Sequence, residues 1–332
     1  MRNPPAEIAL NQTDPDFALR VVASARPTLP SCDGTICAGP FTADRILAHP
    51  ALGAGIRRQA QALLALHQAS PRATAPFATQ QRWLMSQAGL AQYFRNDLAR
   101  PGSGVLAERF IAAVLSHGVA SRNTAAAFVN EMLKYGVVRY VADSAGRRQR
   151  PFEPAPATLT MLLYWLAAHL VTLDGFDGGA RAVALDRRPS LLGAIQPAIA
   201  DGLLASHSIR QPDGTFALFT WVDDGGVVMD RLIAGCTEPA DDARIRTDVT
   251  SVSALAQGLN LSRTQLGRKF AAAEAMGSLG WSGTRGKSAM WVSQAFWRDY
   301  HAAQAVKLAI VDAAFAAAYA DDPLPMHAEL PA

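Results

Sequence analysis

The stretches Ser121-Arg122-Asn123-Thr124 and Ser262-Arg263-Thr264-Gln265 decide how this chain is interpreted, because the second repeats the pattern of the first. When Ser121 is aligned with Ser262 without a gap, Gly136 falls on Gly277, Val138 on Leu279 and Tyr140 on Trp281. A serine followed by an arginine is common by chance. The same spacing to a glycine, an apolar residue and an aromatic residue is less so, and the sequence therefore predicts an internal repeat.

The order of predicted elements is the same in both copies. A short helix leads through a glycine-containing turn into a second helix, which starts at a serine able to cap it and ends at a glycine. A short strand, a basic loop, a return strand and a long apolar helix follow. In chain order the two helices, the loop and the long helix are residues 106–116, 121–136, 143–150 and 156–173 in the first copy, and 252–258, 262–277, 283–287 and 293–320 in the second. This order is typical of a winged helix-turn-helix, in which the second helix enters the major groove of DNA.

The side chains at these positions suit duplex DNA. Arginine pairs well with guanine and amides pair well with adenine in the major groove, while cations in the loops match phosphates. The residues predicted to contact DNA in the first copy are Ser121, Arg122, Asn123, Thr124, Lys134, Arg147, Arg148 and Arg150. In the second copy they are Ser262, Arg263, Thr264, Gln265, Arg268, Lys269, Arg285 and Lys287. For Lys134, Arg268 and Lys269, a solvated helix face is an equal alternative.

Positive charge is concentrated on the two copies. The whole chain of 332 residues has a formal net charge of only +3. Residues 100–150 contain eight Lys and Arg against three Asp and Glu, and residues 246–300 contain seven against three. The rest of the chain is acidic. This distribution is the electrostatic pattern expected of a protein that binds duplex DNA.

The arrangement resembles the MarR-type winged-helix regulators over residues 80–175 and 226–320. The matching residues are Ser121, Gly136-Val137-Val138-Arg139, Asp143, Arg147 and Arg148 in the first copy, and Gly277-Ser278-Leu279 and Arg285 in the second. Members of that family usually bind palindromes as dimers whose terminal helices pack together. The resemblance implies that the long helices of this chain form a pseudo-twofold interface, so that a monomer acts as a pseudo-dimer. Because the two recognition helices differ, we expect an imperfect palindrome, with half-site centres about one helical turn apart.

The predicted fold is mainly α, with tandem winged helix-turn-helix units, long helices in a pseudo-twofold core and small β-wings. The expected organisation is an N-terminal extended arm and helix (1–75), a first winged unit (76–180), a connecting segment (181–225) and a second winged unit with the C-terminal helix (226–332). Further helices are expected at 56–68, 80–96 and 105–115, strands at 136–141, 215–222 and 288–292, and a linker turn at 174–179.

Other features argue against several functional classes. Three cysteines, Cys32, Cys37 and Cys236, form neither a disulfide framework nor a zinc pattern, so no metal is expected. No secretory signal is visible, and the apolar stretch at 159–173 is too short to cross a bilayer, so the chain is expected to be cytoplasmic, in association with the nucleoid. No nucleotide-binding, hydrolase or complete calcium-loop motif is present. We therefore expect neither cofactor nor catalysis.

Several alternatives remain open from the sequence alone. The aromatic residues Tyr164, Trp165, Phe296, Trp297 and Tyr300 fit core packing best, with a pocket for a small-molecule effector as the alternative. A plasmid-type replication initiator also has two winged units in one chain, although the modest net charge counts against it. A protein-interaction scaffold would use the same units without clustering their cations on one face.

Overall fold

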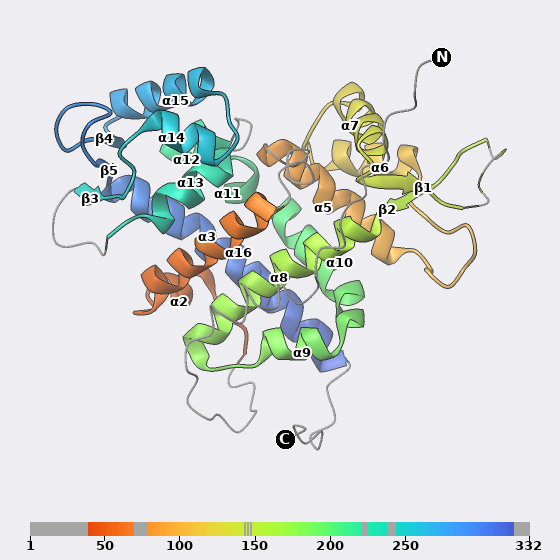
Figure 1. Cartoon of the computed structure of the whole chain (residues 1–332). Helices are drawn as coiled ribbons and strands as arrows, with labels where there is room; N and C mark the ends of the chain where they lie inside the picture. Colours follow the sequence, from red (N-terminus) through yellow and green to blue (C-terminus); the bar gives the residue numbers. More distant parts are fainter. Residues whose placement is uncertain are drawn as a thin grey trace, which may run out of the picture.

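A computed structural model describes residues 39–69, 77, 79–142, 144, 146, 148–220, 225–237 and 244–321. These residues are mostly helical, and their strands form two small antiparallel sheets (Figure 1). The expectation of a mainly α fold is therefore confirmed. The predicted N-terminal arm lies largely outside the described residues, as do Cys32 and Cys37.

The described elements fall into two runs of similar order. The first contains α2 (Ala43–Leu47), α3 (Leu52–Ala69), α5 (Gln80–Arg95), α6 (Ala107–Ser116), α7 (Arg122–Lys134), β1 (Val138–Tyr140), β2 (Phe152–Pro154) and α8 (Pro156–Asp177). The second contains α9 (Arg181–Arg187), a 3-10 turn (Pro189–Leu191), α10 (Leu192–Ala205), α11 (His207–Arg210), α12 (Gly214–Thr220), α13 (Gly225–Ala234), β3 (Arg244–Arg246), α14 (Val252–Gly258), α15 (Arg263–Ala275), β4 (Leu279–Trp281), β5 (Met290–Ser293) and α16 (Gln294–Asp321).

The predicted order of helix, turn, helix, strand, loop and strand occurs twice, in what we call segment I (residues 105–154) and segment II (residues 244–293). In segment II the sheet has the order β3, β5, β4. In segment I, β2 pairs with β1, and Val105 forms an isolated antiparallel bridge to Phe152 of β2. Both segments therefore contain a small sheet whose last strand is central.

The second helix of each segment begins and ends as its sequence predicts. The Ser121 hydroxyl accepts the Thr124 backbone N–H at 3.2 Å, and the Ser262 hydroxyl accepts the Gln265 N–H at 3.4 Å. After each helix, Gly136 and Gly277 have the same φ of 69°, in the left-handed region that glycine adopts without strain. The two helices therefore have the same kind of cap at the start and a glycine of the same conformation after the end.

The duplication extends further than the sequence analysis expected. Helices α8 and α16 begin at Pro156 and Gln294, and α2 and α9 begin at Ala43 and Arg181, so the two pairs have the same separation along the chain. The triplets Leu52-Gly53-Ala54 and Leu63-Leu64-Ala65 of α3 recur in α10 as Leu192-Gly193-Ala194 and Leu203-Leu204-Ala205. The described chain thus consists of a first half (residues 41–177) and a second half (residues 179–321) with equivalent elements.

The two halves exchange helices. Helix α3 of the first half packs against α13 of the second, and α10 of the second packs against α5 of the first. Buried amides join the exchanged pieces: Gln59 donates to Gln304 at 3.0 Å, and Gln196 donates to Gln87. One hydrophobic core extends from Phe41 to Ala318 as a result. Because each half completes the other, we expect the halves to fold as one unit.

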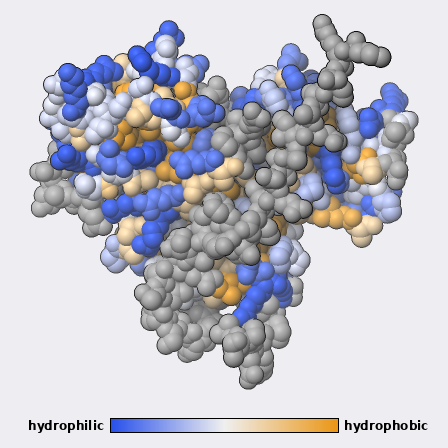
Figure 2. Space-filling view, viewed as in Figure 1, coloured by the Kyte–Doolittle hydropathy of each residue, from blue (hydrophilic) through white to orange (hydrophobic). Residues whose placement is uncertain are grey.

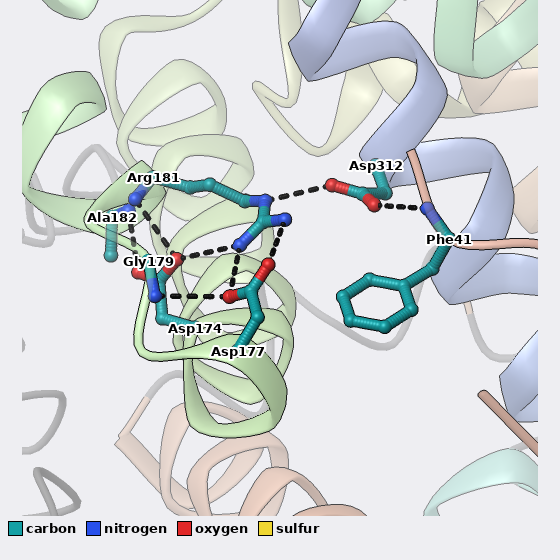
Figure 3. A network of polar contacts seen from close by, with 7 residues as sticks. All are labelled: Phe41, Asp174, Asp177, Gly179, Arg181, Ala182 and Asp312. Atoms are coloured by element: carbon teal, nitrogen blue, oxygen red, sulfur yellow. Dashed lines mark hydrogen bonds and ion pairs between the residues drawn. The ribbon is translucent and has the colours of Figure 1, made fainter. Parts of the chain in front are cut away.

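A buried ion cluster joins the ends of the long helices (Figure 3). The Arg181 side chain, only 3% exposed, donates from Nε to Asp312 at 2.7 Å and from both terminal nitrogens to Asp177 at 2.8 Å. Asp174 accepts the Arg181 backbone N–H at 2.9 Å, and Asp312 accepts the Phe41 N–H at 2.7 Å. Asp174 and Asp312 occupy equivalent positions on α8 and α16, so each half uses an aspartate to hold the chain that enters a short helix.

This cluster corrects one prediction. The segment at 174–179 is not a linker turn, because α8 continues to Asp177 and ends at Gly178, whose φ is 72°. Its two aspartates bind the guanidinium of Arg181. The arginine that pairs with these carboxylates, Arg181, lies two residues beyond the segment, so the segment alone does not reveal the ion pair.

The strand predicted at 215–222 is also wrong. Residues Gly214–Thr220 form α12, and residues 221 and 222 lie outside the described residues. Phe219 is fully buried and makes edge-on contacts with Phe270 and Phe296, while Phe216 packs near Tyr300. An aromatic spacing of three residues fits one face of a helix. The alternating aromatic pattern alone did not distinguish a strand from a helix.

The expectation that the apolar stretch at 159–173 is too short to cross a membrane was wrong, because this stretch belongs to α8, which has 22 residues. Among the described helices, α8 and α16 are long and apolar enough to cross a membrane by length and composition. Both belong to the shared core: Leu166, Leu170 and Leu308 on them are completely buried. A core helix passes the same length and composition test, so this feature by itself is weak evidence for a membrane location.

Candidate nucleic-acid interface

The N-terminal turns of α7 and α15 are exposed. All four residues of Ser121–Thr124 and all four of Ser262–Gln265 are accessible to solvent. The serines already use their hydroxyl oxygens as helix caps, and Thr124 also shares a 2.9 Å hydrogen bond with Ser121. Asn123, Arg263, Thr264 and Gln265 are therefore the residues of these two turns whose side chains are most available to a ligand.

Both helices lie at the same end of the molecule. In Figure 1, α7 and α15 occupy the upper end of the view, while α9 and the C-terminal end of α16 occupy the lower end. The loops that follow β1 and β4 project to opposite sides of the same view. Figure 2 shows hydrophilic residues along the outer edge of the lobe where Figure 1 places α15. An elongated polyanion could therefore reach both helices from one side.

A matching stripe of exposed positions extends along each helix. On α7 the exposed positions at spacings of four, three and four residues are Asn123, Ala127, Asn130 and Lys134. On α15 the equivalent exposed positions are Thr264, Arg268, Ala271 and Ala275. Side chains at such spacings share one helix face, which here extends about 17 Å along the axis. Of the residues predicted to contact DNA, Asn123, Lys134, Thr264 and Arg268 lie on these stripes.

The stripes identify a residue that the sequence analysis missed. Asn130 follows Asn123 after two helical turns on the exposed face of α7, and the helical period alone would have revealed it. Lys269, which was predicted, is half-buried beside the stripe of α15. The two faces present different side chains at equivalent positions. A ligand that contacts both helices would therefore meet different side chains on α7 and on α15.

Two of the predicted cations have partners within the chain. Arg122 forms an ion pair with Glu108 at 3.1 Å, with side chains 59% and 63% exposed. Arg285 lies 3.5 Å from Glu274, whose other oxygen accepts the indole N–H of Trp281 at 2.8 Å. The exposed pair of Arg122 with Glu108 contributes about 0 to 1 kcal/mol, so a phosphate can replace Glu108 at low cost.

The loop cations differ in their surroundings. The Arg150 guanidinium stacks 3.9 Å above the Tyr140 ring, which fixes its position beside β1. Arg148 and Lys287 are exposed, and no ion pair to another described residue involves either of them. Asp143 and Arg147 lie outside the described residues.

The chain matches no family model, and no curated protein or solved structure is significantly similar to it.

Further arginines lie on the short strands, and two of them, on β3, were not predicted from the sequence. Arg244 and Arg246 are exposed on the edge strand β3, and Arg244 stacks 4.5 Å above the Trp291 ring. Arg139 on β1 pairs with Glu153 at 2.9 Å. Alternate residues of a strand share a face, so Arg244 and Arg246 lie together.

Two histidines of the long helices are buried in the core, His169 on α8 and His301 on α16. Burial lowers the pKa of His169 to about 3 and that of His301 to about 4. In each, Nδ1 lies 2.7 Å from a backbone oxygen one helical turn earlier, in Trp165 and Trp297 respectively. Both rings are therefore neutral at pH 7. Within the described residues no group of three or more His, Cys, Asp or Glu could hold a metal.

Proposed function

We propose that this protein is a sequence-specific DNA-binding transcription regulator with two winged helix-turn-helix units, segments I and II, in one chain. In this proposal α7 and α15 enter successive major grooves, and the loops after β1 and β4 contact phosphates. The duplication makes the monomer equivalent to a dimer. One chain therefore binds an imperfect palindrome.

The observation that carries the proposal is the equivalence of the two helix ends. Each begins at a capping serine, is followed at once by an exposed arginine, and lies at the same end of the molecule. The exchange of α3 and α10 between the halves supports it further, because it fixes the spacing of the two units. A fixed spacing is what recognition of two half-sites requires.

The unequal stripes refine the expected target. Asn123 and Asn130 on α7 are amides, which suit adenine, whereas Arg268 on α15 suits guanine. The half-site read by α7 is expected to be richer in A·T pairs than the half-site read by α15. This asymmetry follows from the side chains alone and does not depend on the direction of regulation.

The test is selection of sites from a fragmented genomic DNA pool by the purified protein, with sequencing of the retained fragments. The wild-type chain should enrich one imperfect palindrome, and the double variant Arg122→Ala/Arg263→Ala should lose the enrichment. A matched control is Arg95→Ala/Arg187→Ala, which removes the same charge from exposed positions on α5 and α9. Salt-sensitive binding without any enriched sequence, or equal loss in the control, would contradict the proposal.

A further inference from the structure

A large cavity lies outside the candidate DNA interface. It has a volume of about 560 Å³ and separates segment I from helices α13 and α16 of the second half. Aromatic side chains form much of its wall, including Trp83, Phe128, Phe152, Trp165 and Phe216. Cavities of roughly 300 to 1,000 Å³ with mainly apolar walls are typical of small-molecule sites.

Among the polar side chains of the cavity wall, one group, which we call the polar end, comprises Asp230, Tyr300, Gln304 and Lys307. The Tyr300 hydroxyl donates to Asp230, and Gln304 accepts the hydrogen bond from Gln59 at 3.0 Å. Tyr300 is 1% exposed and Gln304 is 4% exposed. Burial raises the pKa of Asp230. These side chains are positioned by the protein itself, before any ligand binds.

Lys307 is the polar group at this end without a counter-ion in contact. Its ammonium lies 5.9 Å from the centre of the Trp83 ring, and within the described residues it makes neither a hydrogen bond nor an ion pair. Burial lowers its pKa, with Asp230 opposing the shift. Lys307 is half-buried, and Asp230 lies close enough to favour its charge without forming an ion pair with it.

The other half of the molecule shows that the fold does not need these groups. When α8 is aligned with α16 from their first residues, Leu162 corresponds to Tyr300, Leu166 to Gln304 and His169 to Lys307. Helix α8 packs well with its two leucines, which are 6% and 0% exposed. The polar end of the cavity is thus specific to the second half. This points to a role in binding.

We propose that this cavity binds a small apolar carboxylic acid, with its carboxylate on the Lys307 ammonium and its body among the aromatic side chains. The carboxylate would form with Lys307 the ion pair that no described residue provides, and the cavity walls would remove the apolar body from water. An equally apolar alcohol would gain from contact with the walls but would form no ion pair. A cationic amine would be repelled by Lys307.

The test measures binding directly, in the absence of DNA, so its outcome does not depend on the proposed function. Isothermal titration uses 2-naphthoate and decanoate as acids, with 2-naphthalenemethanol and decanol as neutral matches. We expect at least one acid to bind one site per chain. The Lys307→Met substitution should lower the affinity for that acid at least tenfold and leave the affinity for the matching alcohol unchanged. The matched control Arg187→Met, at an exposed position of α9 away from the cavity, should bind like the wild type.

A second variant keeps the test decisive if Lys307→Met does not fold. Leu90 lines the cavity, and Leu90→Trp would fill part of it while Lys307 is retained. Both ligand classes should then bind less tightly. The proposal is overturned if neither acid binds at millimolar concentration, if acid and alcohol bind equally, or if the folded Lys307→Met variant retains the affinity of the wild type.

Discussion

The ion cluster around Arg181 makes a quantitative prediction about stability. Replacing Arg181 with methionine keeps much of the side-chain volume but removes the guanidinium, so its three aspartate partners lose their ion pairs. Asp312, 1% exposed, would be left with only the Phe41 N–H, and Asp174 would keep only backbone donors. Breaking a buried ion pair by removing one partner costs about 3 to 5 kcal/mol. We expect the free energy of unfolding to fall by that amount at pH 7.

The pH dependence of this loss provides a second test. In the wild type, Arg181 lowers the pKa of Asp177, so that pair stabilises the protein at neutral pH, and its contribution is lost as the pH falls through the lowered value. Burial raises the pKa of Asp174 and Arg181 opposes that rise, so in the variant the pKa of Asp174 should be higher still. The folded variant then favours the protonated acid, and its deficit relative to the wild type should shrink as the pH is lowered from 7 towards 4.

The assay is urea denaturation followed by circular dichroism at several pH values. Arg95→Ala is the control, because its pair with Asp201 is exposed by 49% and 59%, and it should cost less than about 1 kcal/mol. The double variant Arg181→Met/Asp312→Leu should recover part of the loss, since it removes the unpaired charge. A cost for Arg181→Met no larger than that of the control, or one independent of pH, would refute this account of the cluster.

Other predictions concern single positions. Ser121→Ala and Ser262→Ala should each lower the free energy of unfolding by about 1 kcal/mol, measured by urea denaturation, because each removes a helix cap. Gly202→Ala should lower the thermal midpoint, since a Cβ there would lie 2.5 Å from Ile310 on α16 at a tight helix crossing; an unchanged midpoint would mean that the crossing can relax. Burial raises the pKa of the Cys236 thiol to about 12, so a thiol reagent should label it at pH 8 only after denaturation, and rapid labelling of the native protein would contradict its burial.

Local chemistry explains what the sequence predicted well. Capping serines, the glycines after each helix and the apolar period of the long helices act over a few residues, and the helices at 122–134, 156–177, 263–275 and 294–321 follow them closely. The elements of the candidate interface were predicted for the same reason. The prediction of a strand at 215–222 was wrong because a short aromatic pattern fits the period of a strand as well as that of a helix. The contacts of Phe219 with Phe270 and Phe296 in the core favour the helix.

Long-range features were beyond sequence reasoning. The full duplication was missed because loops of different length change the offset between the halves: the alignment of Ser121 with Ser262 does not also align Pro156 with Gln294, and few residues are identical. Residues far apart in the sequence determine three of these features. They are the exchange of α3 and α10, the ion pair of Arg181 with Asp312, and the position of Lys307 in the cavity wall. No local pattern encodes such contacts.

The central claim is that one chain contains two DNA-reading units, and a hydroxyl-radical footprint on the selected site tests it most directly. The wild-type chain, bound with one protein per duplex, should protect two half-sites about one helical turn apart. Arg122→Ala should lose protection over one half-site and Arg263→Ala over the other. Equal loss over the whole footprint in both variants, or two chains per site, would contradict the claim.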